Sequence, residues 1–181
     1  MKFGAILVDP PWRFLTRSQK GRGRSPDGPL GHYQTMSLAE LHEIPVAEVA
    51  ADDCALFVWA IDPMLPHAIR LGESWGFTYK TIAFYWAKTN RDGTKFPIGT
   101  GYWTRANCEQ CLLFTRGSPK RLSRSVPRLI VAPRREHSRK PEQARERIER
   151  LVAGPYLDLY GRQSRENWTV VGDQATKFDR P

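Results

Sequence analysis

The chain has 181 residues, of which 40% are hydrophobic and 26% are charged, and 28 Lys and Arg against 19 Asp and Glu give a net charge of +9. This size and composition fit one globular domain that buries its own core without disulfides or metals. No apolar run reaches the ~20 residues of a membrane span, and the opening run ends at Asp9, too early for a signal peptide. We therefore expect a single domain over residues 1–181, in the cytoplasm.

The charge balance favours a polyanionic partner. A basic surface binds phosphate-bearing polymers through release of their counterions. A basic surface that serves only solubility is the simpler alternative. Nucleic acid is therefore the leading partner class, and we expect no membrane partner.

The cysteines are Cys54, Cys108 and Cys111, which are too few for a disulfide framework and suit a reducing compartment. Cys108 and Cys111 have the two-residue spacing of a metal or redox pair, but no second pair completes a zinc site. A zinc or thiol-redox domain is thus the least favoured alternative, and we expect no metal.

Helical patterns occur at three places along the chain. Ser37 and Glu40 form a capping box that predicts a short helix, and Asp62 with Pro63 predict the N-cap and first residue of a helix ending near residue 76. The clearest amphipathic pattern follows Lys140 and ends at Gly154. Its predicted apolar face is Ala144, Ile148, Leu151 and Val152, and its predicted polar face is Arg145, Glu146, Arg147, Glu149 and Arg150.

Apolar and β-branched runs between these helices predict about seven strands. They cover residues 3–8, 54–60, 77–88, 109–116, 128–133, 156–162 and 167–172. Strands that alternate with helices predict a three-layer α/β domain with a mostly parallel sheet, in which ligands bind at the carboxyl ends of the strands.

The motif Asp9-Pro10-Pro11-Trp12 follows the first strand directly and so falls at this ligand-binding edge. Two consecutive prolines hold φ at about −65° and donate no hydrogen bond, so we expect a stiff turn whose carbonyls are free to accept from a ligand. The alternative is a strand-ending turn with a core tryptophan. Average residue frequencies make the four-residue string rare, which favours the catalytic interpretation.

These groups suit methylation of an exocyclic amine such as that of adenine, whose lone pair is delocalised into the ring. Asp9 and the Pro10 carbonyl could each accept one amine hydrogen, while Trp12 stacks on a base swung out of the helix. The electrophile would be the sulfonium methyl of S-adenosylmethionine. Positioning and electrostatics would then supply most of the rate.

Further motifs make the chain similar to one family over nearly its whole length: HYQTMSLAEL, LFVWAID, CEQCLLF, SRKPEQ, LDLYGR and NWTVVGDQ. It resembles the family named for the seventy-kilodalton subunit of the messenger-RNA adenosine-N6 methyltransferase, with its bacterial and phage DNA relatives. The resemblance implies a Rossmann-like class I methyltransferase fold in circularly permuted order, with the catalytic motif first and the cofactor strand last.

The resemblance also implies roles for individual residues, with S-adenosylmethionine as cofactor. Contacts to the target base would come from Tyr33, Trp59, Glu109 and Lys140. The cofactor would be held by Asp9, Lys140, Asp158, Leu159, Tyr160, Arg162, Asp173 and Gln174, with Arg162 on the ribose hydroxyls.

Two basic segments are predicted to contact the nucleic-acid backbone beside the pocket, although charge runs are usually just solvated. One is a long loop with Arg17, Lys20, Arg22 and Arg24, and the other includes Arg121, Arg124, Arg134 and Arg135. No segment is left over for a separate target-recognition domain. Site preference would therefore be weak, or a second copy in a homodimer or a partner subunit would supply it.

The sequence thus predicts an S-adenosylmethionine-dependent adenine-N6 methyltransferase that acts on DNA. The closest alternative is the same reaction on RNA. A non-catalytic nucleic-acid-binding subunit is an alternative of another class, and the intact Asp-Pro-Pro-Trp motif argues against it.

Overall fold

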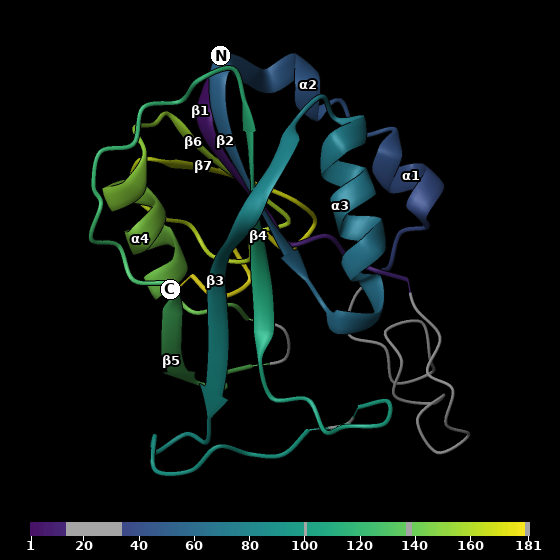
Figure 1. The fold of residues 1–181 in the computed structure, drawn as a ribbon, viewed down its shortest axis with the longest axis vertical. Helices are drawn as coiled ribbons and strands as arrows, with labels where there is room; N and C mark the ends of the chain where they lie inside the picture. The colour runs from purple at the N-terminus through teal and green to yellow at the C-terminus, as the bar shows by residue number, and fades with distance from the viewer. Residues whose placement is uncertain (14–33, 100, 137–138, 180–181) are drawn as a thin grey trace.

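The computed structural model describes residues 1–13, 34–99, 101–136 and 139–179. A seven-stranded sheet runs through the middle of the molecule in the order β5-β3-β4-β2-β1-β6-β7 (Figure 1). The strands are β1 (Phe3–Val8), β2 (Ala50–Ala60), β3 (Thr78–Thr89), β4 (Glu109–Arg116), β5 (Leu129–Pro133), β6 (Tyr156–Leu159) and β7 (Trp168–Val171).

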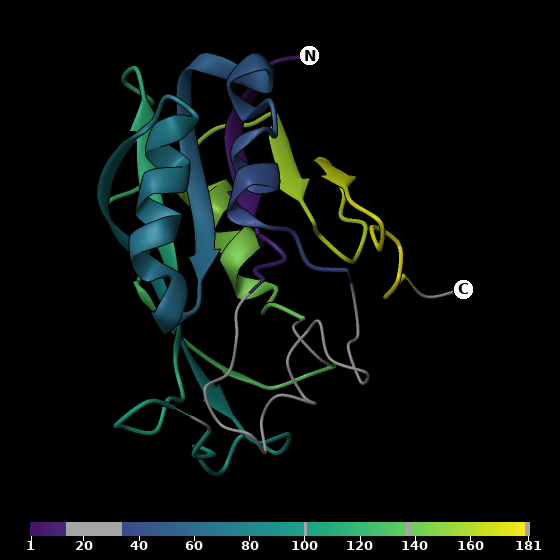
Figure 2. The same cartoon turned by 90° about the vertical axis from the view of Figure 1, so that its right-hand side faces the viewer.

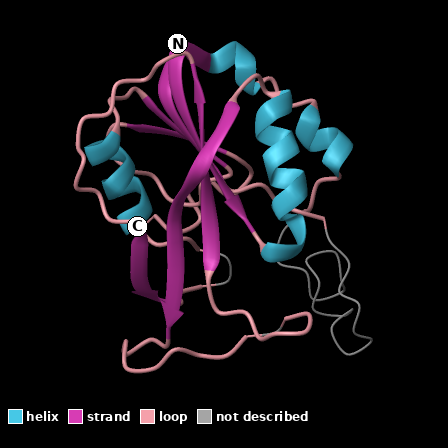
Figure 3. Cartoon of the chain, in the orientation of Figure 1, coloured by secondary structure: helices cyan, strands magenta, loops and turns pink. Residues whose placement is uncertain are grey.

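Helices lie on both faces of this sheet (Figures 1, 2 and 3). One face is covered by α1 (Leu38–His42), α2 (Val46–Val49) and α3 (Leu65–Ser74), and the other by α4 (Gln143–Leu151). Successive strand residues point to opposite faces, so Val8 packs in the same core as Leu71 of α3, and Leu7 in the same core as Ile148 of α4. Burial of each such apolar side chain stabilises the folded state by about 2 kcal/mol. One core on each face of the sheet confirms the three predicted layers.

The sheet is mostly parallel, as predicted, because four of its six neighbouring strand pairs run parallel. Strand β1 runs parallel to β2 and β6, with Val8 opposite both Val58 and Leu159, so the three carboxyl ends meet at one edge. β4 runs antiparallel to β2 and β3. Its first residue, Glu109, therefore reaches the edge where its neighbours end.

The first two predicted helices differ in outcome. The capping box is confirmed, since the Ser37 hydroxyl accepts from the backbone N–H of Glu40 at 3.3 Å and the Glu40 carboxylate accepts from that of Ser37 at 2.7 Å. The predicted N-cap at Asp62 is wrong. Asp62–Met64 form a separate 3-10 turn before α3, and the Asp62 carboxylate accepts from the Gln110 amide of β4 instead of capping a helix. Within the described ranges no helix is long and apolar enough to cross a membrane.

Candidate functional site

The Asp-Pro-Pro-Trp motif leaves β1 at the carboxyl edge of the sheet, as expected. The backbone N–H of Asp9 donates to the Leu159 carbonyl at 3.1 Å, so the pairing of β1 with β6 extends one residue into the motif. This contact fixes the start of the turn, and Leu159, which was predicted to hold the cofactor, lines neither of the two cavities described below. The Asp9 side chain then stands at the junction of the three strand ends.

The two proline carbonyls are not free, which corrects the sequence prediction. The Pro10 carbonyl accepts from the backbone N–H of Trp12 at 2.8 Å, and the Pro11 carbonyl accepts from that of Met36 at 2.9 Å. The turn is so tight that it closes on itself, and the segment before α1 pairs with it. A carbonyl oxygen has two lone pairs, so Pro10 can still accept a second hydrogen bond.

Trp12 lies in the hydrophobic core, where it is only 4% exposed. Its indole N–H donates to the Trp59 carbonyl at 3.2 Å, which ties the motif to the end of β2. The predicted stacking of a target base on Trp12 does not fit this placement, because core side chains enclose the ring. Trp12 instead supports the turn, as the alternative interpretation of the motif had it.

Four charged side chains form a chain of alternating sign at this edge. The Lys140 ammonium lies 2.9 Å from Asp9 Oδ2 and 3.3 Å from Glu109 Oε2, and the Lys88 ammonium lies 2.5 Å from Glu109 Oε1. Lys140 also lies 5.7 Å from the centre of the Trp59 ring. The structure thus brings together Asp9, Glu109, Lys140 and Trp59, although they are far apart in sequence.

The two carboxylates of this chain differ in their pKa values. Burial raises the pKa of Asp9, and the Lys140 ammonium opposes the rise. Burial acts in the same direction on Glu109, but Lys140 and Lys88 outweigh it and lower the pKa of Glu109 to about 2. Glu109 is therefore a permanent anion that holds Lys140, while Asp9 is the carboxyl that accepts a proton more readily.

Two cavities meet at Asp9 and Arg162, which line both. The larger has a volume of about 290 Å³ and the smaller about 40 Å³. The larger is lined by these predicted site residues: Asp9, Pro10, Pro11, Tyr160, Arg162, Asp173 and Gln174. Predicted residues on the smaller are Asp9, Trp59, Lys140, Asp158 and Arg162. Tyr33, Arg17, Lys20, Arg22 and Arg24 lie outside the described residues.

The donors and acceptors of the larger cavity fit a nucleoside-like ligand that carries an ammonium group. Asp9 and Asp173 offer carboxylate acceptors, and Arg162 and Gln174 offer donors. The Lys140 contact uses Oδ2 of Asp9, so Oδ1 can face a ligand. The volume is close to the lower end of the roughly 300–1,000 Å³ typical of ligand sites.

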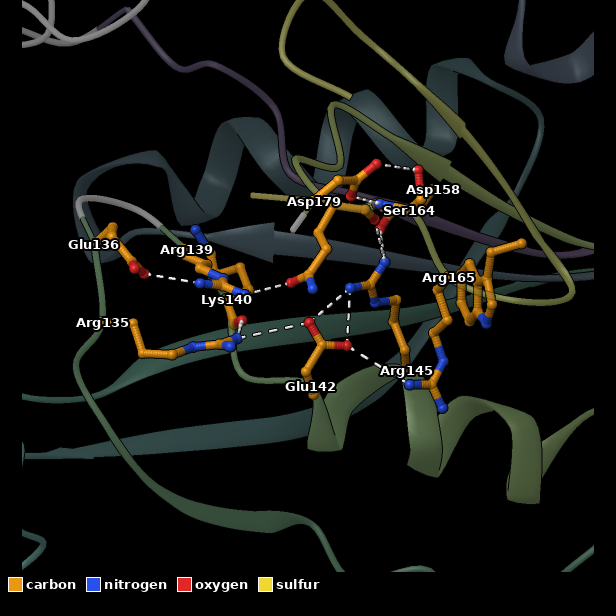
Figure 4. A network of polar contacts seen from close by, with 12 residues as sticks. Arg135, Glu136, Arg139, Lys140, Glu142, Arg145, Asp158, Ser164, Arg165 and Asp179 are labelled. Carbon is orange, nitrogen blue, oxygen red and sulfur yellow. Dashed lines mark hydrogen bonds and ion pairs between the residues drawn. The ribbon is translucent and has the colours of Figure 1, made fainter. Parts of the chain in front are cut away.

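A buried ion network lies next to the smaller cavity (Figure 4). Arg145 donates to both carboxylate oxygens of Glu142 at 2.7 and 2.8 Å and to the Gln163 carbonyl at 2.9 Å, and it lies 3.5 Å from Asp158. The prediction that Arg145 faces solvent is wrong, because the buried Asp158 carboxylate draws the guanidinium inward. Sequence reasoning missed this network, although a carboxylate within the apolar strand β6 signals a buried cation.

The predicted second basic segment is divided by the fold. Arg135 donates to the Lys140 carbonyl at 2.6 Å, and Arg134 is exposed in the same stretch after β5. Arg121 pairs instead with Val152, at the end of α4 opposite to Lys140. The direction of β4 explains this division. Because β4 runs antiparallel to β2, the chain leaves it at the edge where the parallel strands begin, and Arg121 and the exposed Arg124 follow there.

The segment that carries Lys140 is held from its other side by Arg139. Its guanidinium donates to the Gln163 side chain and to Glu136, and it lies 4.6 Å from the centre of the Phe178 ring. The chain after β7 thereby packs against the residue next to Lys140. Arg139 and Arg135 thus both anchor the segment that carries Lys140.

The cysteine pair does not form a common site. Cys111 is buried in β4, where burial raises the pKa of its thiol, whereas Cys108 is exposed. Burial also raises the pKa of Cys54, to about 12. Across the described ranges, no three His, Cys, Asp or Glu side chains gather as metal ligands.

Asp158→Asn is expected to change how stability depends on pH. Burial raises the pKa of Asp158 from 3.8 to about 7 against the opposing effect of Arg145. The native state therefore binds the proton more tightly than the unfolded state, and this residue lowers stability as pH rises from about 4 to about 7. The free energy of unfolding of Asp158→Asn minus that of wild type should therefore increase by roughly 2–4 kcal/mol from pH 4 to pH 8, as measured by urea unfolding. Parallel pH profiles of the two proteins would contradict this, and the exposed Asp52→Asn is the control.

The mostly parallel sheet, with its acidic turn after β1 and its cavity at the strand ends, defines a Rossmann-like α/β fold of the methyltransferase class. The chain belongs to the MT-A70 family, whose pattern matches residues 3–174. This confirms the family expected from the sequence motifs.

Named relatives fall into two groups of different length. The chain is 31% identical to the Type II methyltransferase M.MunI of Mycoplasma sp, over 94% of this chain and 77% of that protein. It is 30% identical to the N(6)-adenosine-methyltransferase MT-A70-like protein of Drosophila melanogaster, over 96% of this chain and 27% of that protein. It is 29% identical to the human N(6)-adenosine-methyltransferase catalytic subunit METTL3, over 96% of this chain and 28% of that protein. The chain thus spans about a quarter of these two animal relatives.

Proposed function

We propose that this protein transfers a methyl group from S-adenosylmethionine to the N6 amine of adenine in DNA. The observation that carries the proposal is the half-buried Asp9 carboxylate, which Lys140 holds at the carboxyl end of β1 beside the larger cavity. Family membership and the N(6)-adenosine-methyltransferase relatives support the N6 reaction on adenine. The Type II methyltransferase, most of whose length this chain spans, supports DNA as the substrate.

The cofactor contacts are assigned from the lining of the larger cavity. When bound, S-adenosylmethionine supplies an electrophilic methyl group on a sulfonium centre. Arg162 would donate to its ribose hydroxyls, and Asp173 with Gln174 would approach its adenine. One oxygen of Asp9 would accept from its ammonium group, and Lys140 neutralises the other.

The target amine is activated by acceptors rather than by a covalent step. Asp9 and the second lone pair of the Pro10 carbonyl accept the two amine hydrogens, which draws the nitrogen lone pair out of conjugation with the ring. Because burial raises the pKa of Asp9, its carboxylate can also take the proton that the methylated amine releases. The ion pair with Glu109 holds Lys140 in place, so the acceptor is oriented before the reaction.

The test is to incubate the protein with S-adenosylmethionine and, separately, duplex DNA, single-stranded DNA and RNA, and to measure N6-methyladenine by mass spectrometry after digestion. We expect product from DNA. Product from RNA alone would overturn the choice of DNA and favour the second candidate, to which the METTL3 relatives point. Binding of cofactor and nucleic acid without product on any substrate would instead indicate a non-catalytic subunit.

A further inference from the structure

The connection between β3 and β4, described over residues 90–99 and 101–108, extends past the carboxyl edge of the sheet and lies at the bottom of Figures 1 and 2. This segment is termed the arm. Lys88 precedes it near the end of β3, and Glu109 follows it as the first residue of β4. Since these two residues bond to each other and Glu109 bonds to Lys140, the arm starts and ends at the charge chain of the site.

The arm exposes large apolar side chains. Phe96 is 60% exposed, Ile98 80%, Tyr102 69% and Trp103 91%. The other five tryptophans of the chain are each at most 8% exposed: Trp12, Trp59, Trp75, Trp86 and Trp168. Clusters of exposed apolar side chains mark interaction surfaces.

The arm is a built structure with defined internal bonds. The Asn107 amide donates to the Lys88 and Pro97 carbonyls at 2.9 and 2.6 Å, which ties both ends of the arm together. At Gly101 a Cβ would lie 2.0 Å from the Thr104 carbonyl oxygen, so only glycine allows this tight fold. Trp103 follows with a left-handed φ of 67°. A left-handed φ is a strained conformation for tryptophan, and the residue held in it has its ring exposed to solvent.

The charge of the arm complements a polyanion. Arg91, Lys95 and Arg105 are exposed, and Asp92 is the one acidic residue between positions 90 and 108. Aromatic rings among cations are typical of surfaces that bind nucleic-acid strands, where bases stack on the rings and phosphates meet the cations. A purely apolar protein interface has no need of this surplus positive charge.

We propose that the arm binds the DNA around the target adenine, with Trp103 stacked on a base next to the extruded one and Arg105 on a phosphate. The identity of the substrate rests on the proposed function. The stacking contact itself is independent of turnover, because binding alone reports it.

The test compares Trp103→Ala with Trp103→Phe, and uses Leu122→Ala as the matched control. Leu122 is also exposed, but it pairs with Leu151 at the opposite end of α4 from Lys140. We expect the Kd of Trp103→Ala for a fluorescent DNA duplex to rise about tenfold, since base–aromatic stacking has this magnitude, and Trp103→Phe to recover most of the loss. The KM for DNA should rise in parallel, with the Kd for S-adenosylmethionine unchanged.

A second measurement uses the exposure of Trp103. Acrylamide should quench its fluorescence in the free protein, and saturating DNA should protect it, whereas Trp103→Ala should show no protectable fraction. Arg105→Ala should reduce the slope of log Kd against log salt by about one.

Wild-type affinity in Trp103→Ala, or quenching that DNA does not reduce, would overturn the proposal. A Trp103→Ala protein that changes its sedimentation from dimer to monomer and keeps its DNA affinity would also overturn it, because the arm would then bind a second copy. Failure of the proposed function gives a different result: no N6-methyladenine from any variant, with DNA protection of Trp103 intact.

Discussion

Replacing Asp9 with asparagine should lower kcat for adenine methylation by about 100- to 1,000-fold, which is the effect of removing one preorganised electrostatic contact to a reacting group. The amide keeps the shape of the carboxylate but offers one acceptor oxygen and no charge. The contact to the amine matters most as the nitrogen becomes tetrahedral, so kcat should fall far more than the KM for DNA rises. Initial rates of N6-methyladenine formation at saturating S-adenosylmethionine measure this.

The matched control is Asp62→Asn. Asp62 also follows a strand that ends at the carboxyl edge, but it is exposed and lines neither cavity. Its activity should remain close to that of wild type. Equal activity of Asp9→Asn and wild type would refute the role given to Asp9, provided that circular dichroism shows both variants folded.

Lys140→Met should destabilise the protein by about 2–4 kcal/mol and abolish most activity, because it leaves the half-buried Asp9 without its cation and takes one of two cations from Glu109. Lys140 lowers the pKa of both carboxyls, so the stability that it provides is largest where both are ionised. The loss should therefore be full at pH 8 and should shrink as pH falls, first through the pKa of Asp9, which burial raises further once Lys140 is gone, and then through that of Glu109. Urea unfolding at several pH values measures both effects.

Lys88→Met is the matched comparison for Lys140. It removes an ammonium from the same Glu109 carboxylate but leaves both ion pairs of Lys140. We expect a smaller loss of stability and a wild-type pKa at Asp9. If Lys88→Met and Lys140→Met lose equal stability and activity, then Lys140 does not have the central place in the charge chain that its distances suggest.

The strands were predictable because their signal is local. The run of residues 109–116 coincides with β4 at both ends, and the catalytic turn follows directly after β1. Strand direction, by contrast, depends on pairing across the sheet. The sequence therefore could not show that β4 is antiparallel, or that Arg121 and Arg135 consequently lie at opposite edges.

Burial of polar and aromatic groups was the second source of error. Trp12 and Arg145 have side chains that suit either a core or a surface, and their surroundings come from residues far away in the chain. Trp59 lies 47 positions from Trp12, and Asp158 lies 13 from Arg145. The convergence of Asp9, Glu109 and Lys140 was expected from family resemblance rather than from any periodicity.

The indole bond from Trp12 to the Trp59 carbonyl makes the catalytic turn a product of chain closure over long range. During synthesis the Asp-Pro-Pro-Trp segment is made before β2, which supplies its Trp59 partner, and well before Lys140. A nascent or truncated chain therefore carries the motif without the chemistry. Competence arises only with the finished sheet, because the supports of the motif come from β2 and from the segment before α4.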